Sequence, residues 1–159
     1  MKILTTITLI LVSQVTTLAD TKVMLPDNER FARDDKEFLV ASTIPGNFTT
    51  PEGIVAALLI LGDQVANKKL TAPFSPKAIT STSGGKNALP LAAYYRGARL
   101  QKGKIIVAFS GEAMRYLNST VSIQMVVKGS IERTLQLHFP AVKTVEYEID
   151  GKVVSEWDA

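Results

Sequence analysis

The sequence predicts a small α+β domain, in which a mixed, mainly antiparallel sheet has two main helices packed on one face. Two long stretches, beginning near residues 50 and 120, repeat apolar residues at helical spacing. Shorter β-branched or alternating runs, bounded by turns that contain glycine, are typical of strands joined in hairpins. The chain has 159 residues, which is enough for one domain with a continuous core.

The first 19 residues have the pattern of a secretory signal peptide. Lys2 precedes an apolar run from Ile3 to Leu18, and small side chains occupy Thr17 and Ala19, the two positions that an export peptidase reads. The run is shorter than the roughly 20 apolar residues of a membrane span, and it contains several threonines. We therefore expect an exported protein, periplasmic or extracellular. The alternative is an uncleaved membrane anchor.

The mature chain would begin with a polar, charge-rich segment, residues 20–36, which we expect to be a flexible lead-in. A single domain over residues 37–157 would follow, beginning with a strand at Glu37–Thr43, where apolar and β-branched residues favour a sheet. Thr50 then precedes Pro51, and this pair suits an N-cap and the first helical position. The apolar stripe after it predicts a helix that faces the core.

The middle of the chain is a loop and then a β-hairpin. Residues 71–89 are loop-like, and their Ser-Thr-Ser-Gly-Gly-Lys-Asn run lacks the leading glycine and the final hydroxyl of a phosphate-binding loop. The hairpin that follows has one strand within Tyr94–Leu100 and the other at Ile105–Phe109. Ser110 then occupies the N-cap position of a short helix, Gly111–Asn118.

A second long helix is expected from about Thr120 to Phe139, ended by Pro140. Gly129 within this helix predicts close packing against a neighbouring element. The apolar residues that recur every four positions along it are Ile123, Val127, Ile131 and Leu135.

The domain would close with a strand pair. Val145, Tyr147 and Ile149 alternate with two glutamates, so we expect the three to face the core and the glutamates to face solvent. Asp150-Gly151 predicts a tight turn into a last strand, Lys152–Val154.

The charged residues of the second long helix are explained by structural roles and do not indicate a catalytic site. Glu132 and Arg133 would lie on the solvent side of the helix. His138, the only histidine, would lie at its C-terminal end, where the helix dipole favours a cation. Ser110 lacks the flanking glycines of a nucleophile elbow. We therefore expect no catalytic residues.

The composition of the chain excludes several further classes of function. The chain has no cysteine, which excludes thiolate metal sites, disulfides and thiol catalysis. Removal of residues 1–19 takes away one base and no acid, which lowers the formal charge from +3 to +2. That charge is too small and too dispersed for a nucleic-acid binder. We expect no metal, no cofactor and no nucleic acid.

Several stretches together resemble the GerMN domain family, which occurs in sporulation, spore-germination and envelope proteins. The resemblance extends over Glu37–Lys152. Its close is carried by Ile131-x-x-Thr134-Leu135, then Phe139, Val142, Val145 and the Ile149–Lys152 run. Upstream, the similar stretches are Ile54–Asp63 for the first helix, Lys86–Ser110 for the hairpin and Val107–Leu117 for the buried strand and short helix.

The resemblance implies a non-enzymatic, exported module of the cell envelope, with a fold similar to the ring-building motif of secretion and sporulation complexes. It implies an envelope protein as partner, leaves homo-oligomerisation open, and gives membrane contact only if the signal segment is retained as an anchor. Strand alternation would turn one tyrosine of the hairpin outward beside two arginines, and both residue types are enriched at interfaces. The candidate partner surface is therefore Tyr94, Tyr95, Arg96 and Arg99.

Two other functions remain open. One is a periplasmic hydrolase or carbohydrate-active enzyme that uses a pair of carboxylates. The other is a small-ligand binder with residues 71–87 as a lid.

Overall fold

The computed structural model describes residues 19–61, 67, 69–74, 89–117 and 121–154. It confirms the α+β class. The expected signal segment, apart from Ala19, and the Ser-Thr-Ser-Gly-Gly-Lys-Asn run lie outside the described residues. Of the helices that the structure describes, none combines the length and apolar content that crossing a membrane requires.

The elements follow one another along the chain in an order close to the expected one. The strands are β1 (Thr21–Pro26), β2 (Leu39–Ile44), β3 (Tyr95–Gln101), β4 (Lys104–Phe109), β5 (Thr144–Ile149) and β6 (Lys152–Val154). The α-helices are α1 (Asn28–Ala32), α2 (Pro51–Ile60), α4 (Met114–Leu117) and α5 (Val121–His138). Two short 3-10 turns, η2 (Leu91–Tyr94) and η3 (Gly111–Ala113), precede β3 and α4.

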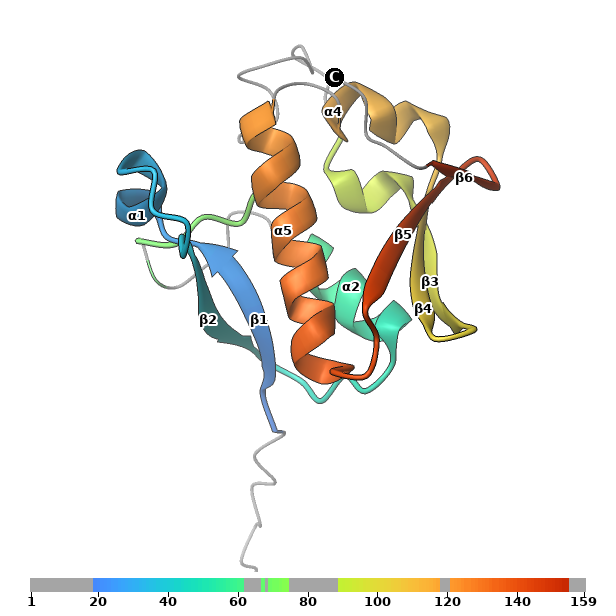
Figure 1. The fold of residues 1–159 in the computed structure, drawn as a ribbon, viewed down its shortest axis with the longest axis horizontal. Coiled ribbons are helices and arrows are strands. Elements are labelled where there is room, and N and C mark those ends of the chain that lie inside the picture. The colour runs from blue at the N-terminus through green and yellow to red at the C-terminus, as the bar shows by residue number, and fades with distance from the viewer. Residues whose placement is uncertain (1–18, 62–66, 68, 75–88, 118–120, 155–159) are drawn as a thin grey trace, which may run out of the picture.

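The strands form two sheets where the sequence predicted one. β1 and β2 pair as an antiparallel two-stranded ribbon, and the other strands form a mixed sheet in the order β3-β4-β5-β6. Among the described strand pairs, β4 and β5 alone are parallel, because α4 and α5 carry the chain between them. Figure 1 shows α5 and α2 between the ribbon and the four-stranded sheet.

The expected flexible lead-in, residues 20–36, is wrong for β1 and α1. Within β1, Val23 and Leu25 are 0% and 1% exposed, and both belong to the main core. The segment is ordered because its short apolar alternation pairs with β2, six residue pairs in register. The charges that suggested a solvated tail lie outside this strand, at Asp20 and after Pro26, or at its exposed position Lys22.

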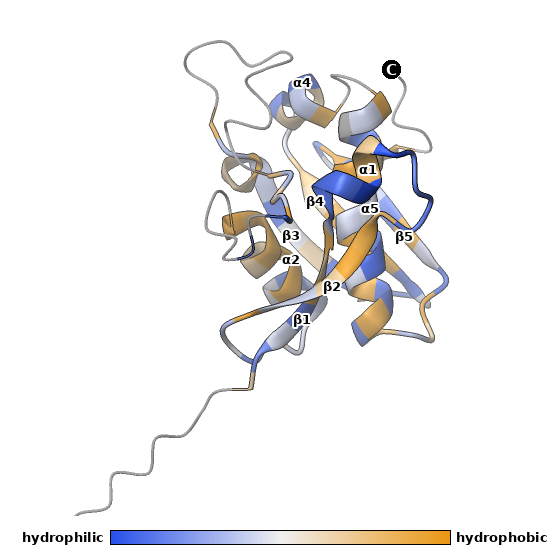
Figure 2. Ribbon diagram, turned by 90° about the vertical axis from the view of Figure 1, so that its left-hand side faces the viewer, coloured by the Kyte–Doolittle hydropathy of each residue, from blue (hydrophilic) through white to orange (hydrophobic). Residues whose placement is uncertain are grey.

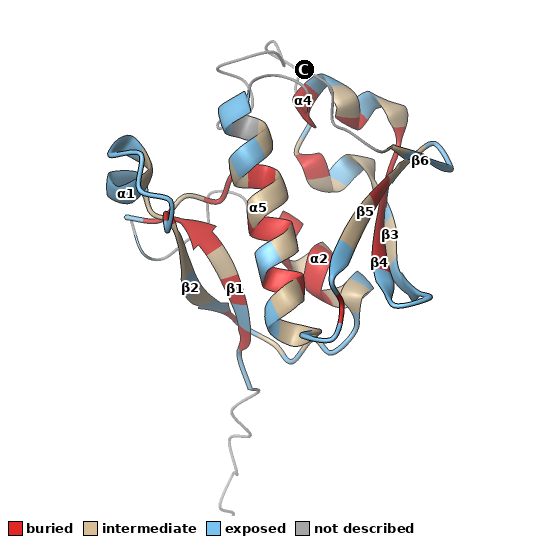
Figure 3. Cartoon of the chain, in the orientation of Figure 1, coloured by how far each residue is buried: buried red, intermediate tan, exposed pale blue. Residues whose placement is uncertain are grey.

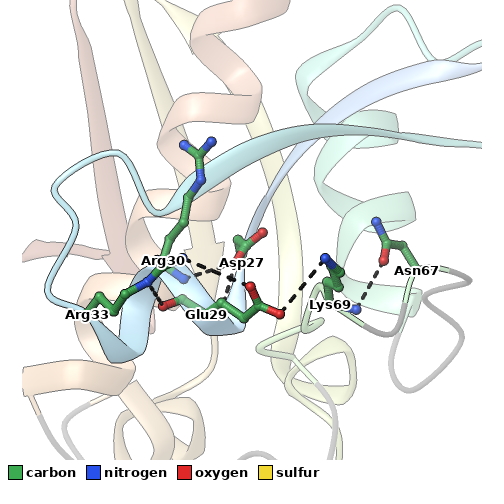
Figure 4. Close-up of polar contacts among 6 residues, drawn as sticks. All are labelled: Asp27, Glu29, Arg30, Arg33, Asn67 and Lys69. Carbon is green, nitrogen blue, oxygen red and sulfur yellow. Dashed lines mark hydrogen bonds and ion pairs between the residues drawn. The ribbon is translucent and has the colours of Figure 1, made fainter.

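Helix α1 is fixed by its cap and by a segment from further along the chain. Asp27 accepts hydrogen bonds from the backbone N–H groups of Glu29 and Arg30, both 3.0 Å, as an N-cap does. Figure 4 shows Glu29 reaching Lys69, 3.9 Å away, while the Lys69 N–H donates to the Asn67 side chain. The charged part of residues 20–36 is therefore folded back onto the domain.

Both main helices are confirmed, and they form the centre of the core. Thr50 caps α2 by accepting from the Gly53 N–H, 3.1 Å, with Pro51 at the first helical position. Figure 3 shows the buried residues of α2, α5 and β4 gathered between the two sheets. The fully buried apolar side chains of α2 and α5 are Ile54, Val55, Leu58, Leu59, Val127, Ile131 and Leu135.

The helices pack on one face of the four-stranded sheet, and none of the described helices packs on the other. On β4, Ile105, Val107 and Phe109 enter the core cluster, and the residues between them face outward. Two ion pairs cross that outer face, Arg99 with Glu148 at 2.6 Å and Lys104 with Glu146 at 2.5 Å. The glutamates of β5 therefore point away from the helices, as the alternation predicted.

Candidate functional site

The described residues form a groove between α5 and the β1–β2 ribbon. Its volume is about 550 Å³. One wall is the exposed side of α5, and the other is the open face of the ribbon with the turn that leads into β2. The lining residues are Met24, Lys36, Glu37, Phe38, Leu39, Met125, Lys128, Gly129, Glu132, Arg133, Gln136 and Leu137.

The strand register explains why these ribbon residues face the groove. Val23 and Leu25 turn into the core, so Met24 and its cross-strand neighbours Leu39 and Ala41 lie on the opposite face. Gly129 allows α5 to approach this face closely, because a Cβ there would lie 3.0 Å from Leu39 Cδ1. The close packing predicted for Gly129 is confirmed, and it closes the floor of the groove.

Glu132 is a partly buried titratable residue of the groove, and its pKa is shifted from the ordinary value for glutamate. Burial raises the pKa of its carboxyl, while Lys128, Tyr147 and Arg133 partly offset the effect. The Tyr147 hydroxyl donates to Glu132 Oε1 at 3.3 Å, and Lys128 Nζ lies 3.9 Å from the same oxygen. Glu132 was expected on the solvent side of α5, but its side chain is only 29% exposed, because β5 packs beside that part of α5.

The groove combines apolar and charged contacts in a way that fits a polypeptide. Met125 and Leu137 are 52% and 48% exposed on α5, and Met24 adds a second flexible thioether. Methionine adapts its shape to a partner surface, and methionine and arginine are enriched at interfaces. Charges of both signs line the same groove, so it can pair with acids and bases of a bound segment.

The structure does not bring the candidate partner residues together as one exposed patch. Tyr94 packs on Tyr116, with ring centroids 5.4 Å apart, and Tyr95 packs on Phe109 at 5.8 Å. Both tyrosines lie against the core, so the outward tyrosine that strand alternation predicted is absent at these positions. The reason is that Tyr94 ends the 3-10 turn η2, where the alternation of a strand does not apply.

The polar groups of Tyr95, Arg96 and Arg99 already form hydrogen bonds or ion pairs within the domain. The Tyr95 hydroxyl donates to the Glu52 carbonyl at 3.2 Å, and desolvation raises its pKa. Arg96, the extra residue of a β-bulge, donates to two nearby carbonyls, while Arg99 pairs with Glu148. A role for these residues in binding a partner stays a prediction.

The residues considered for chemistry serve the architecture. His138 Nε2 lies 2.8 Å from the Lys22 carbonyl, so the imidazole joins the end of α5 to β1. Ser110 occupies the N-cap position before η3, as predicted, but its hydroxyl makes no capping bond. Within the described ranges, no cluster of three histidine or acidic side chains is arranged to hold a metal ion.

Comparison with family models, with curated proteins and with solved structures gave no match to this chain.

Proposed function

We propose that this chain is an exported, non-enzymatic module of the cell envelope that acts through protein–protein contact. The signal-peptide pattern and the resemblance to GerMN domains support export and an envelope role. The observation that carries the binding role is the groove between α5 and the ribbon. It is lined by two methionines, a leucine with half its surface exposed, and charges of both signs.

The groove suits an extended or helical segment of a partner better than a small compact ligand. It lies along the exposed side of α5 over residues 125–137, about three turns of helix. A partner that lays apolar side chains along such a helix would cover Met125 and Leu137, which water now reaches. Burial of this apolar surface would supply the affinity, and the flanking charges would fix the orientation.

The test is recovery of a partner from an envelope extract by immobilised protein, with Met125→Lys as the disruptive variant. Met125 is half-exposed, so this substitution leaves the fold intact while it places a charge in the groove. Leu100→Lys is the matched control, because Leu100 is 56% exposed on β3, outside the groove. The proposal requires a specific envelope protein that wild type and Leu100→Lys retain and Met125→Lys loses.

A second candidate, a carboxylate-based hydrolase, is favoured by one observation. A glutamate with a raised pKa in a groove is a suitable general acid, and Glu37 lines the same groove. Under this alternative, Glu132→Gln would abolish hydrolysis of a glycan or ester substrate. Under the binding proposal, no hydrolysis would be found with wild type, and Glu132→Gln would still retain the partner.

A further inference from the structure

The two outer edges of the β1–β2 ribbon differ in their hydrogen bonding. The outer edge of β1 is hydrogen-bonded to α5 and to the segment around Lys69–Thr71. Three hydrogen bonds reach β1: Lys22 O with His138 Nε2 (2.8 Å), Met24 N to Thr134 Oγ1 (2.9 Å) and Thr71 N to Pro26 O (3.0 Å). A fourth, Asn28 N to Lys69 O (2.9 Å), follows just beyond the strand. Figure 1 shows β1 lying between β2 and α5.

No described residue is hydrogen-bonded to the outer edge of β2. Lys22 and Met24 direct their backbone groups away from β2, so their antiparallel partners Thr43 and Ala41 direct theirs away from β1. Leu39, opposite Pro26, does the same. In the described part of the chain, no hydrogen bond reaches the backbone N–H or C=O groups of these three residues.

This edge also lacks the features that keep exposed strands from pairing. Edge strands are usually protected by charges, by proline or by a bulge. The β2 sequence, Leu-Val-Ala-Ser-Thr-Ile, has no charge and no proline, and its register with β1 is continuous. Figure 2, in which β2 faces the viewer, shows this strand in orange to white. The edge therefore presents backbone groups at β-sheet spacing, and its chemical complement is another extended strand.

We propose that the strand that covers it is β2 of a second copy, paired antiparallel about a two-fold axis at Ala41. In this register Ala41 faces its own equivalent, and Leu39 faces Thr43 of the second copy. The three outward residues of each copy then exchange six hydrogen bonds, and the ribbon becomes a four-stranded sheet, β1-β2-β2-β1.

The sequence of the edge fits self-pairing. Alanine at the axis lets two identical strands meet without crowding, and no charged residue within β2 opposes its own equivalent. Beyond the strand, Glu37 would face Pro45 and Lys36 would face Gly46, so like charges are kept apart at both ends. Pro45 also ends the pairing, because it has no N–H to donate.

Dimerisation would place two copies of the proposed binding groove on the same side of the assembly. The two-fold axis of an antiparallel strand pair stands perpendicular to the sheet, so the same face of each ribbon points to the same side. Both grooves would therefore open on one side of the dimer. A partner with two binding segments would gain affinity from this arrangement without any new contact.

The first experiment is sedimentation of the purified protein from about 1 µM to about 1 mM, the range of modest affinities. We expect a monomer–dimer equilibrium. Ala41→Pro removes an outward N–H that β1 does not use, so we expect dimer affinity to fall at least about 10-fold, equivalent to about 1.4 kcal/mol, with little change in the melting temperature. Ala41→Thr, which keeps the N–H and adds no charge, is the matched control and should still dimerise.

The second experiment reads the register directly. Because the chain has no cysteine, Ala41→Cys introduces a single thiol, and mild oxidation should join two copies through the residue at the axis. Lys22→Cys, exposed on β1, should not cross-link. A wild type that stays monomeric at all concentrations would overturn the proposal. So would a dimer that survives Ala41→Pro, or one that Ala41→Cys fails to cross-link. Each of these results leaves partner recovery through the groove unaffected.

Discussion

Asp150 caps a helix that begins 39 residues earlier in the chain. Its Oδ1 accepts a 3.0 Å hydrogen bond from the Gly111 N–H, at the start of η3. A Cβ on Gly111 would lie 2.5 Å from Asp150 Oδ2, so any other residue at this position would displace the carboxylate. Asp150 also has φ of 48° and Gly151 has φ of 79°, which defines the tight turn between β5 and β6. One aspartate therefore joins the turn to the end of β4.

Replacement of Asp150 by alanine should lower the free energy of unfolding by roughly 1–2 kcal/mol, from the lost cap and the left-handed backbone. Asp150→Asn keeps an acceptor oxygen and tolerates the same backbone, so it should stay within about 0.5 kcal/mol of wild type. Urea unfolding of both variants measures the difference. Equal stability of the two variants would show that the cap contributes nothing.

The contact between Thr134 and Met24 makes a second prediction. Thr134 is fully buried, and its hydroxyl accepts from the Met24 N–H of β1 at 2.9 Å. Thr134→Val keeps the shape but leaves that N–H without a partner, which should cost about 1–3 kcal/mol. Thr134→Ser keeps the acceptor and loses one methyl group, so it should cost about 1 kcal/mol. Hydrogen exchange at the Met24 amide should quicken in the valine variant more than in the serine variant.

The raised pKa of Glu132 predicts a pH dependence of stability. The folded state binds this proton more tightly than the unfolded state, so the group stabilises the fold at low pH. That contribution decreases as the pH rises above about 4.5, the ordinary value for glutamate, through the raised value in the folded state. Glu132→Gln keeps an acceptor for Tyr147 and removes the titration. The slope of unfolding free energy against pH between 4.5 and 7 should differ between the two proteins, with wild type losing more stability as the pH rises.

The core position of β1 can be tested with a truncating substitution. Leu25→Ala should destabilise the protein by about 2–5 kcal/mol, because the side chain is buried and its removal leaves a cavity. Lys22→Ala is the control on the same strand, since Lys22 is exposed and only its backbone carbonyl bonds to α5. Thermal unfolding should separate the two variants clearly. Little change in Leu25→Ala would mean that β1 is dispensable.

The sequence predicted the elements whose signals are local. The Thr50 cap, the four-residue spacing of α5 and the Asp150-Gly151 turn each depend on a few neighbouring residues, and each is confirmed. β1 was missed because its alternation is short and the charges after it suggested a tail. Its true partners, β2 and α5, are identified only by pairing between distant segments.

The groove could not be predicted for the same reason. Met24 and Met125 lie about a hundred residues apart, and nothing in either neighbourhood indicates that they share a wall. Glu132 looked solvent-exposed because α5 was expected to bury one stripe only. The helix in fact packs against the ribbon on one side and near β5 on the other. Thr134 and Ser130, both fully buried, are the polar residues in the helix that could have indicated this.

The bonds between β1 and α5 join residues that are 110 and 116 positions apart. During synthesis, β1 leaves the ribosome more than 100 residues before its bonding partners in α5, so it has no helix to dock against until α5 has been made. Contacts of such long range also slow the closure of a domain. Docking of β1 on α5 must therefore wait until α5 has been made, so we expect it to be a late step of folding.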